Sequence, residues 1–184
     1  MESPDVPWGK RDVNRVRKRM EEKPSRAAVF FFEFLQSHGV STGRLVDLGC
    51  GAGRNAVFFV EKGFEVHAVD RSDEVLKDIE LHGVMPHCHS VTDYWLFEDE
   101  FFDLAVDIFC FSEQVEKDHK SLYARELVRV LRKGGHYMIS VPAAYPREDI
   151  AGHFPGFEII ASEDSEDVQR GRRFKVINLI LRKL

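Results

Sequence analysis

The stretch Val46-Asp47-Leu48-Gly49-Cys50-Gly51-Ala52-Gly53 decides the fold, because it joins a β-rich run to three glycines and then a helical run. Glycine adopts the left-handed backbone of tight turns and lets a ligand come close to the chain. The helix that starts after Gly53 offers free backbone N–H groups at its first turn. This order of elements predicts an α/β fold with a ligand at the first strand-to-helix turn.

An acidic residue ends the next β-rich run. Asp70 lies 21 positions beyond Gly49, where a carboxylate can accept both hydroxyl groups of a ribose. The glycines and Asp70 together predict an adenosine-containing ligand across the carboxyl ends of the first two strands. The alternative is a set of ordinary turn glycines in an unrelated α/β fold, with a solvated Asp70.

The spacing of the glycines argues against a dinucleotide. A dinucleotide site needs G-x-G-x-x-G/A, but Arg54 stands where that pattern has its third small residue. Asp47, two positions before Gly49, adds a negative charge beside the turn. That charge suits a cationic ligand better than a pyrophosphate.

Outward from this turn, short β-rich runs alternate with helical runs, which predicts a mostly parallel sheet covered by helices. Strands are expected at 44–48, 64–69, 86–90, 102–109, 136–141, 157–161 and 174–181, and helices at 24–38, 55–62, 72–82 and 119–132. Gly134 and Gly135 are expected to turn the chain before the fifth strand. The loop 162–173 would join the last two strands as an antiparallel hairpin.

Composition narrows the class of protein. The 184 residues make one domain, and the net charge of -5 gives no general attraction to nucleic acid. No run reaches the roughly 18 apolar residues of a membrane span, and residues 1–9 do not resemble a signal peptide. Three cysteines without a C-x-x-C pair fit a reducing cytoplasm.

The segment Lys10–Met20 predicts a basic amphipathic helix. Its basic face is either an ordinary solvated face or a patch for an anionic substrate or a membrane surface.

These residues resemble motif I of the class I S-adenosylmethionine-dependent methyltransferases. The resemblance extends through Ala68-Val69-Asp70, Phe102-Asp103-Leu104-Ala105-Val106 and Leu127-Val128-Arg129-Val130-Leu131-Arg132-Lys133-Gly134-Gly135, and so covers about residues 44–141. It implies a Rossmann-like, seven-stranded, mostly parallel sheet of order 3-2-1-4-5-7-6. It also implies a helical lid or arm at 1–43 and an S-adenosylmethionine-binding domain at 44–184.

The resemblance further implies a cofactor site for S-adenosylmethionine, with S-adenosylhomocysteine as the product. In it, Asp47 lies near the methionine ammonium, Asp70 holds the ribose diol and Asp93 accepts from the adenine amino group. Asp93 has an alternative reading as a surface residue that starts a helix. The implied cofactor-binding residues are Asp47, Gly49, Cys50, Gly51, Gly53, Asp70, Arg71, Asp93, Tyr94 and Ile108.

Methyl transfer to a nucleophile requires alignment and exclusion of water, so no universal catalytic residue is expected. His119, His136 and Glu113 are candidate bases because each is expected near a strand's carboxyl end or the loop after it, although solvated or structural roles remain open. His87-Cys88-His89 is not expected to bind metal, since alternation along a strand separates Cys88 from the histidines. The candidates for a lid over the cofactor are Trp8, Tyr145 and His153.

The run Asp107-Ile108-Phe109-Cys110 lacks the two prolines of amino-group nucleic-acid methyltransferases, and no cysteine has the Pro-Cys setting of cytosine-C5 enzymes. The expectation is therefore a cytoplasmic methyltransferase with a small-molecule acceptor. Small enzymes that resemble this one, including the tellurite-resistance type and thiol methyltransferases, serve varied acceptors. Two alternatives stay open: a non-catalytic cofactor-binding regulatory subunit, and a methyltransferase with a protein or RNA acceptor.

Overall fold

The computed structural model describes residues 23–77, 79–113, 115–169 and 172–184. The expected basic helix Lys10–Met20 and the lid candidate Trp8 lie outside these residues. Within them, no helix has the length and apolar character that crossing a membrane requires.

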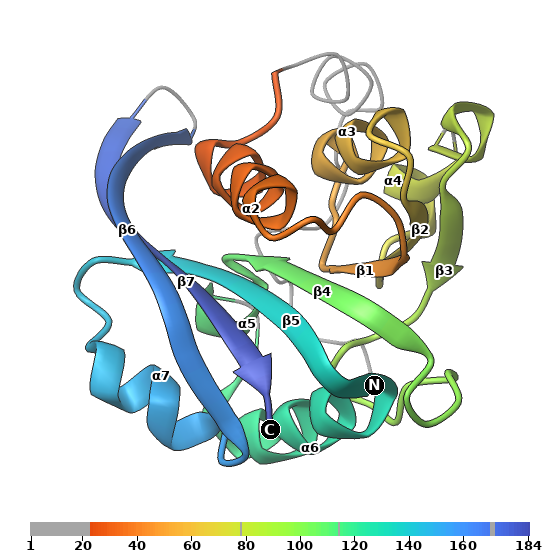
Figure 1. Ribbon diagram of the computed structural model, residues 1–184. Helices are drawn as coiled ribbons and strands as arrows, with labels where there is room; N and C mark the ends of the chain where they lie inside the picture. The colour runs from red at the N-terminus through yellow and green to blue at the C-terminus, as the bar shows by residue number, and fades with distance from the viewer. Residues whose placement is uncertain (1–22, 78, 114, 170–171) are drawn as a thin grey trace.

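One seven-stranded sheet forms the centre of the molecule, in the order β3-β2-β1-β4-β5-β7-β6 (Figure 1). Its strands are β1 (Arg44–Leu48), β2 (Glu65–Asp70), β3 (Met85–Cys88), β4 (Phe102–Ile108), β5 (Leu131–Pro142), β6 (Phe157–Gln169) and β7 (Arg172–Lys183). The first five strands are parallel, and β7 runs antiparallel to both β5 and β6. The predicted strand order and antiparallel C-terminal pair are confirmed.

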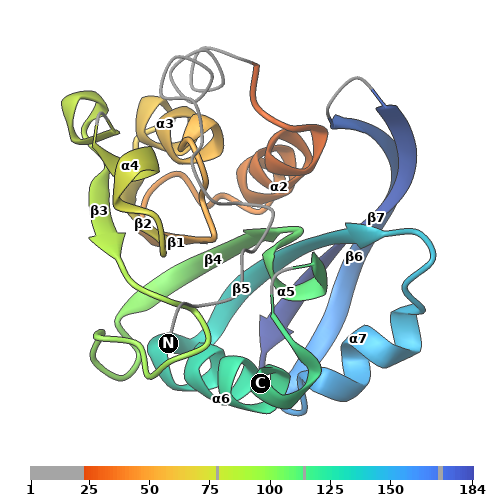
Figure 2. The ribbon, with the colours of Figure 1, turned by 180° about the vertical axis from the view of Figure 1, so that it is seen from behind.

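Helices cover both faces of the sheet (Figures 1 and 2). One face carries α2 (Arg26–Ser37), α3 (Arg54–Glu61), α4 (Asp73–Leu76) and the 3-10 turn η1 (Ile79–His82); the other carries α5 (Cys110–Glu113), η2 (Lys117–His119), α6 (Lys120–Val130) and α7 (Arg147–His153). Side chains alternate between the faces along each strand, so Leu45 packs on the α2 side and Val46 on the α6 side. The core therefore has two layers, one under each set of helices.

Helix α2 is part of the folded core. The Ser25 hydroxyl caps it by accepting a hydrogen bond from the Ala28 N–H, and the Ser25 N–H donates to Asn55 Oδ1. Phe31 and Leu35 are buried in the same cluster as the first strand. The assignment of residues 1–43 to an arm and 44–184 to the cofactor domain stays a prediction.

The predicted helix 72–82 is wrong, because the chain forms the short α4 and then the 3-10 turn η1. Ser72 occupies the N-cap position, but its side chain makes no capping bond. Its backbone N–H instead donates to Asp70 Oδ1 at 3.0 Å. The break brings Ile79 against the glycine turn, where a Cβ added to Gly53 would lie 2.9 Å from Ile79 Cγ2.

β5 starts at Leu131, earlier than predicted, and includes Gly134 and Gly135. The expected change of direction is present inside the strand, because Gly134 has a left-handed φ of 74° and regular pairing with β4 resumes at His136. The pairing of β4 with β5 shifts register between Phe102 and Leu104. A Cβ on Gly135 would lie 2.8 Å from the Asp103 carbonyl oxygen, so only glycine fits this close approach. The glycines therefore form an irregularity within the strand pairing.

The predicted loop 162–173 is a continuation of the hairpin. β6 extends to Gln169 and β7 begins at Arg172, with pairing along the whole length. Two acidic residues of β6 pair with a basic or an aromatic residue of β7: Glu166 lies opposite Lys175 and Asp167 opposite Phe174. Such cross-strand pairs stabilise two long strands in a stretch whose charged sequence predicted a loop. Helix α7 and the short turns α5 and η2 had no sequence prediction.

Candidate active site

The glycine turn lies between β1 and α3. Gly49, Gly51 and Gly53 have φ values of 71°, 55° and 77°, which is the left-handed region where side chains are strained. The backbone N–H groups of Gly49 and Cys50 both donate to the Val69 carbonyl oxygen, at 2.8 and 3.0 Å. The turn is therefore held against the end of β2.

The three glycines differ in what surrounds them. A Cβ on Gly49 would lie 2.5 Å from Cys110 Sγ, and one on Gly53 would meet Ile79. A Cβ on Gly51 would meet no atom of the described residues within 4 Å. Protein packing accounts for the first and third glycines, whereas the middle one borders open space that a ligand can enter.

Asp70 ends β2 beside this turn. Its two carboxylate oxygens accept the backbone N–H groups of Gly51, at 2.9 Å, and Ser72, at 3.0 Å. A carboxylate has about four acceptor sites, so each oxygen retains a lone pair for a ribose hydroxyl. The side chain is thus fixed in place and can still accept hydrogen bonds.

Asp47 is buried beneath the turn, with 3% of the residue exposed. Its Oδ2 atom has no hydrogen-bond partner among the described residues. Burial, reinforced by the negative charges of Asp107 and Asp70, raises the pKa of the Asp47 carboxyl to about 7. An unpartnered, buried carboxylate oxygen is the kind of group that a ligand cation would satisfy, and so these residues fit a sulfonium cofactor with an ammonium group.

Asp107, at the end of β4, is a site residue that sequence reasoning missed. Its Oδ1 accepts the Cys110 N–H at 2.9 Å, and its Oδ2 accepts the Phe111 N–H at 3.0 Å and the Tyr123 hydroxyl at 2.5 Å. Burial raises the pKa of the Asp107 carboxyl to about 7. A carboxylate directly after the apolar run Leu104-Ala105-Val106 was the signal in the sequence that could have identified it.

The bonds to Asp107 shape the turn that follows β4. Phe109 has a φ of 70°, unusual for a bulky residue, and its N–H donates to the Ser140 carbonyl at 3.0 Å. This conformation places Cys110 against Gly49. The end of β4 and the glycine turn therefore pack directly on each other, as the predicted position of Ile108 near the site requires.

The residues predicted to border the adenine lie after β2 and β3. Arg71 and Asp93 are exposed, and Tyr94 is 68% exposed. The His89 N–H donates to the Asp70 carbonyl at 3.0 Å, which joins the loop after β3 to the end of β2. This bond brings the predicted adenine-side residues to the same edge as Asp70.

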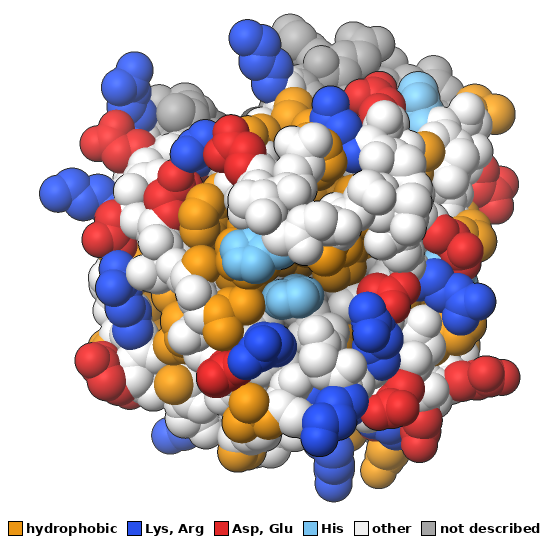
Figure 3. Space-filling model, viewed as in Figure 1, with side chains coloured by type: hydrophobic (Ala, Val, Ile, Leu, Met, Phe, Trp, Pro, Cys, Tyr) orange, Lys and Arg blue, Asp and Glu red, His pale blue; other side chains and the backbone are white. Residues whose placement is uncertain are grey.

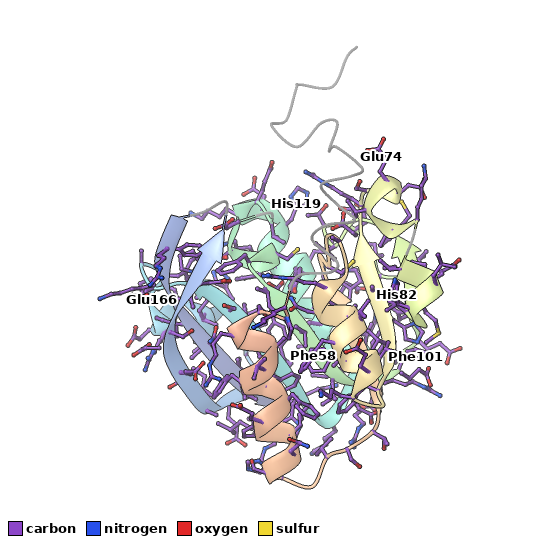
Figure 4. All side chains as sticks on the ribbon, turned by 90° about the horizontal axis from the view of Figure 1, so that it is seen from above. Phe58, Glu74, His82, Phe101, His119 and Glu166 are labelled. Atoms are coloured by element: carbon purple, nitrogen blue, oxygen red, sulfur yellow. The ribbon has the colours of Figure 1, made fainter. Side chains whose placement is uncertain are left out.

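The three candidate bases do not come together. Glu113 on α5 and His119 on η2 are exposed. Figure 4 shows His119 and Glu74, which follow β4 and β2, on the opposite side of the molecule from Phe101, which precedes β4. His119 thus lies on the same side as the carboxyl ends of the strands.

The expected position of His136 is wrong. It lies near the beginning of β5, paired with Leu104, four positions before Ser140 pairs with Ile108 at the carboxyl end of β4. Its ring contacts Phe34 of α2, with ring centroids 5.7 Å apart. Figure 3 shows histidine side chains beside hydrophobic ones on this face of the molecule. The predicted strand 136–141 already begins at His136, so its own bounds put this residue away from the carboxyl end of β5.

His67 of β2 and His87 of the edge strand β3 form a pair, in which His67 is buried and His87 is half-buried. His67 Nδ1 and His87 Nε2 are 2.9 Å apart, and Glu65 Oε1 is 3.3 Å from His67 Nε2. Within the described ranges, no group of three or more histidine, cysteine or acidic side chains could hold a metal ion. The His67 ring contacts the rings of Phe97, Phe101 and Phe102, and the His87 ring contacts Phe97, so the pair packs against aromatic side chains.

The comparisons with known proteins agree with this geometry. Residues 45–135 match the family described as a methyltransferase domain. A search of curated proteins found no match. Among solved structures, an S-adenosylmethionine-dependent methyltransferase from Methanosarcina mazei is 17% identical with a TM-score of 0.72, covering 82% of this chain and 97% of that chain.

Two further structures have the same fold. A TehB-like S-adenosylmethionine-dependent methyltransferase from Corynebacterium glutamicum is 16% identical with a TM-score of 0.72, covering 92% of this chain and 94% of that chain. The 1,6-didemethyltoxoflavin-N1-methyltransferase from Burkholderia thailandensis, solved with its acceptor and S-adenosylhomocysteine, is 22% identical with a TM-score of 0.69, covering 94% and 81%. By its family match and its sheet, the protein is a class I S-adenosylmethionine-dependent methyltransferase, with S-adenosylmethionine as its cofactor.

Proposed function

We propose that this protein transfers the methyl group of S-adenosylmethionine to a small-molecule acceptor bound beside the turn after β4. Two features of the turn after β1 carry the proposal. Among the described residues, Gly51 borders open space and one carboxylate oxygen of Asp47 has no hydrogen-bond partner. When bound, the cofactor supplies an electrophilic methyl group on a sulfonium sulfur.

In this proposal, the chain's own residues bind and orient. Asp47 pairs with the cofactor ammonium, Asp70 accepts the ribose hydroxyls, and the Gly49–Gly53 turn provides the close backbone approach. Arg71, Asp93 and Tyr94 border the adenine. Ile108 and Phe109 place the end of β4 beside the methyl group and exclude water from it.

The small-molecule acceptor is supported by the short connections on the acceptor side. Residues 109–119 link β4 to α6, and residues 143–156 link β5 to β6 through α7. The Burkholderia thailandensis structure, of similar fold, was solved with the small molecule 1,6-didemethyltoxoflavin. The cytoplasmic location stays a prediction.

Calorimetric titration with S-adenosylmethionine, S-adenosylhomocysteine and NAD tests the cofactor site. The first two should bind in the micromolar range and NAD should not bind. Asp70→Ala should lower the affinity for S-adenosylmethionine by about 100-fold, because it removes two hydrogen bonds to a charged group. Asp73→Ala is the matched control, because Asp73 is an exposed neighbour whose carboxylate pairs with Lys77. Equal affinity in the wild type and Asp70→Ala would contradict the site.

A further inference from the structure

One lysine of the α6 face is buried without a counter-charge. Lys120, the first residue of α6, is 9% exposed, and its Nζ donates to the Tyr145 hydroxyl at 2.6 Å. The same Nζ lies 4.7 Å from the centre of the Phe111 ring and 4.9 Å from that of Tyr145. Within the described part of the chain, no carboxylate lies within 4.0 Å of it.

Two other lysines show what is unusual here. The Lys183 side chain is also partly buried. Its Nζ, however, donates to the carbonyl oxygens of Val128 and Leu131 and lies 3.7 Å from a carboxylate oxygen of Glu100. Lys62 lies 5.3 and 5.4 Å from two phenylalanine rings, but it is exposed to water. Lys120 alone of these three combines burial with a lack of anionic or carbonyl partners.

The energetics favour an anion beside Lys120. An ammonium has three N–H donors, and the Tyr145 hydroxyl uses one of them. Contact with aromatic rings offsets only part of the cost of removing a charge from water. A carboxylate would supply the missing charge and accept the remaining hydrogen bonds.

The neighbouring groups point the same way. The ring of His153 contacts Phe111, with centroids 5.2 Å apart. Burial first, and the positive charge of Lys120 second, lower the pKa of the His153 imidazole. Ser112, next to Phe111, has a buried hydroxyl with no partner among the described residues. His153 is therefore a second basic side chain near Lys120, and the carboxylate of Asp149 acts on its imidazole in the opposite sense.

The position connects Lys120 to the reaction site. Cys110 packs against Gly49 of the cofactor turn, and the next residue, Phe111, lies under the Lys120 ammonium. Tyr145 follows the carboxyl end of β5. Figure 2 shows α5, α6 and α7 together on this face of the sheet.

We infer that Lys120 and Tyr145 form an anion-binding subsite that holds a carboxylate of the methyl acceptor. This inference rests on the proposed function and gives its acceptor a chemical class, an anionic small molecule whose nucleophile is separate from its carboxylate. Lys120 binds and orients that carboxylate, while Tyr145 holds the ammonium in place.

The test uses benzoate and its neutral analogue benzamide as probes, titrated by NMR into the complex with S-adenosylhomocysteine. Wild-type protein should bind benzoate at least about tenfold more tightly than benzamide. Lys120→Met should lose that preference while keeping its affinity for S-adenosylhomocysteine. Lys62→Met, the matched control with an ammonium over two rings, should keep the preference.

Unfolding by urea separates binding from a structural role. Replacing an uncompensated buried charge with an apolar side chain of similar length should leave the unfolding free energy unchanged or higher. Should Lys120→Met fail to fold, Lys120→Gln keeps a hydrogen-bond donor without the charge and should also lose the preference. Equal wild-type affinity for benzoate and benzamide, or retention of the preference in the folded Lys120 variants, would overturn this inference alone. Failure to bind S-adenosylhomocysteine would overturn the proposed function and this inference with it.

Discussion

Two neighbouring strands, β1 and β4, each end near a buried aspartate, and the two carboxylates have different surroundings. Asp107 accepts hydrogen bonds from two backbone N–H groups and the Tyr123 hydroxyl. Asp47 keeps one oxygen without a partner in the part of the chain that the structure describes. Burial raises the pKa of both carboxyls to about 7, so burial alone does not distinguish them. Their hydrogen-bond partners do distinguish them. A carboxylate whose two oxygens both accept bonds from the protein stabilises the fold, whereas one with an unpartnered oxygen is available to a ligand.

The largest expected difference between the two aspartates is in stability. Asp107→Ala should lower the unfolding free energy by about 3 kcal/mol, because three buried donors lose their acceptor. Asp47→Asn should change it by less than about 1 kcal/mol. Urea unfolding measures both variants. Equal losses would mean that Asp47 is as much a structural residue as Asp107.

The glycines of the turn extend the comparison. Gly49→Ala should destabilise by about 3 kcal/mol, because it adds a clash with Cys110 to left-handed strain. Gly51→Ala should cost only about 1 kcal/mol, yet weaken S-adenosylmethionine binding at least about tenfold, since its methyl group enters the open space. Calorimetry and thermal unfolding test the pair. Unchanged affinity in Gly51→Ala would place the cofactor elsewhere.

The unpartnered oxygen of Asp47 should make cofactor binding depend on pH. The ligand ammonium pairs with the ionised carboxylate, and the pKa of Asp47 in the free protein is raised to about 7. Affinity for S-adenosylmethionine should therefore rise about tenfold between about pH 6 and pH 8. Asp47→Asn should bind more weakly at the higher pH and lose this slope. A slope that persists in Asp47→Asn would assign it to another group.

The same two carboxyls make a smaller contribution to the pH dependence of folding. Their pKa values are raised in the folded state from 3.8, so the stability they contribute is present below about pH 4 and lost as pH rises toward 7. The His67 and His87 pair has the opposite sign. Burial lowers the pKa of both imidazoles from 6.5, so their contribution is lost as pH falls below about 6.5.

The smallest predicted effect concerns the histidine pair and tests whether its contribution to stability is lost at acid pH, opposite to that of the two aspartates. His87→Gln should flatten the loss of unfolding free energy between about pH 7 and pH 5, because one of the two titrating imidazoles is gone. His82→Gln, an exposed histidine near the same strand, serves as the control and should leave the curve unchanged. An identical acid slope in His87→Gln and wild type would contradict a role for the pair.

The sequence alone determined the local elements whose signals lie within a few residues. Hydrophobic alternation, three glycines and a terminal aspartate predicted β1, its turn, β2 and the cofactor residues around them, and the family resemblance supplied the strand order. It misjudged 162–173, where charged side chains gain their support from the opposite strand. The sequence also did not show why glycine is needed at Gly135. The reason is the carbonyl oxygen of Asp103 in β4, which lies too close for a side chain.

Only the tertiary structure decided which polar groups have partners. Asp47 and Asp107 look alike in the sequence, because each is the second-last residue of its strand and follows apolar residues. Their difference comes from Tyr123 and from the turn after β4. Lys120 is an ordinary lysine at a helix start until Phe111 and Tyr145 bury it. Hydrogen-bond satisfaction and burial depend on residues far apart along the chain, so the fold determines them and the local sequence does not.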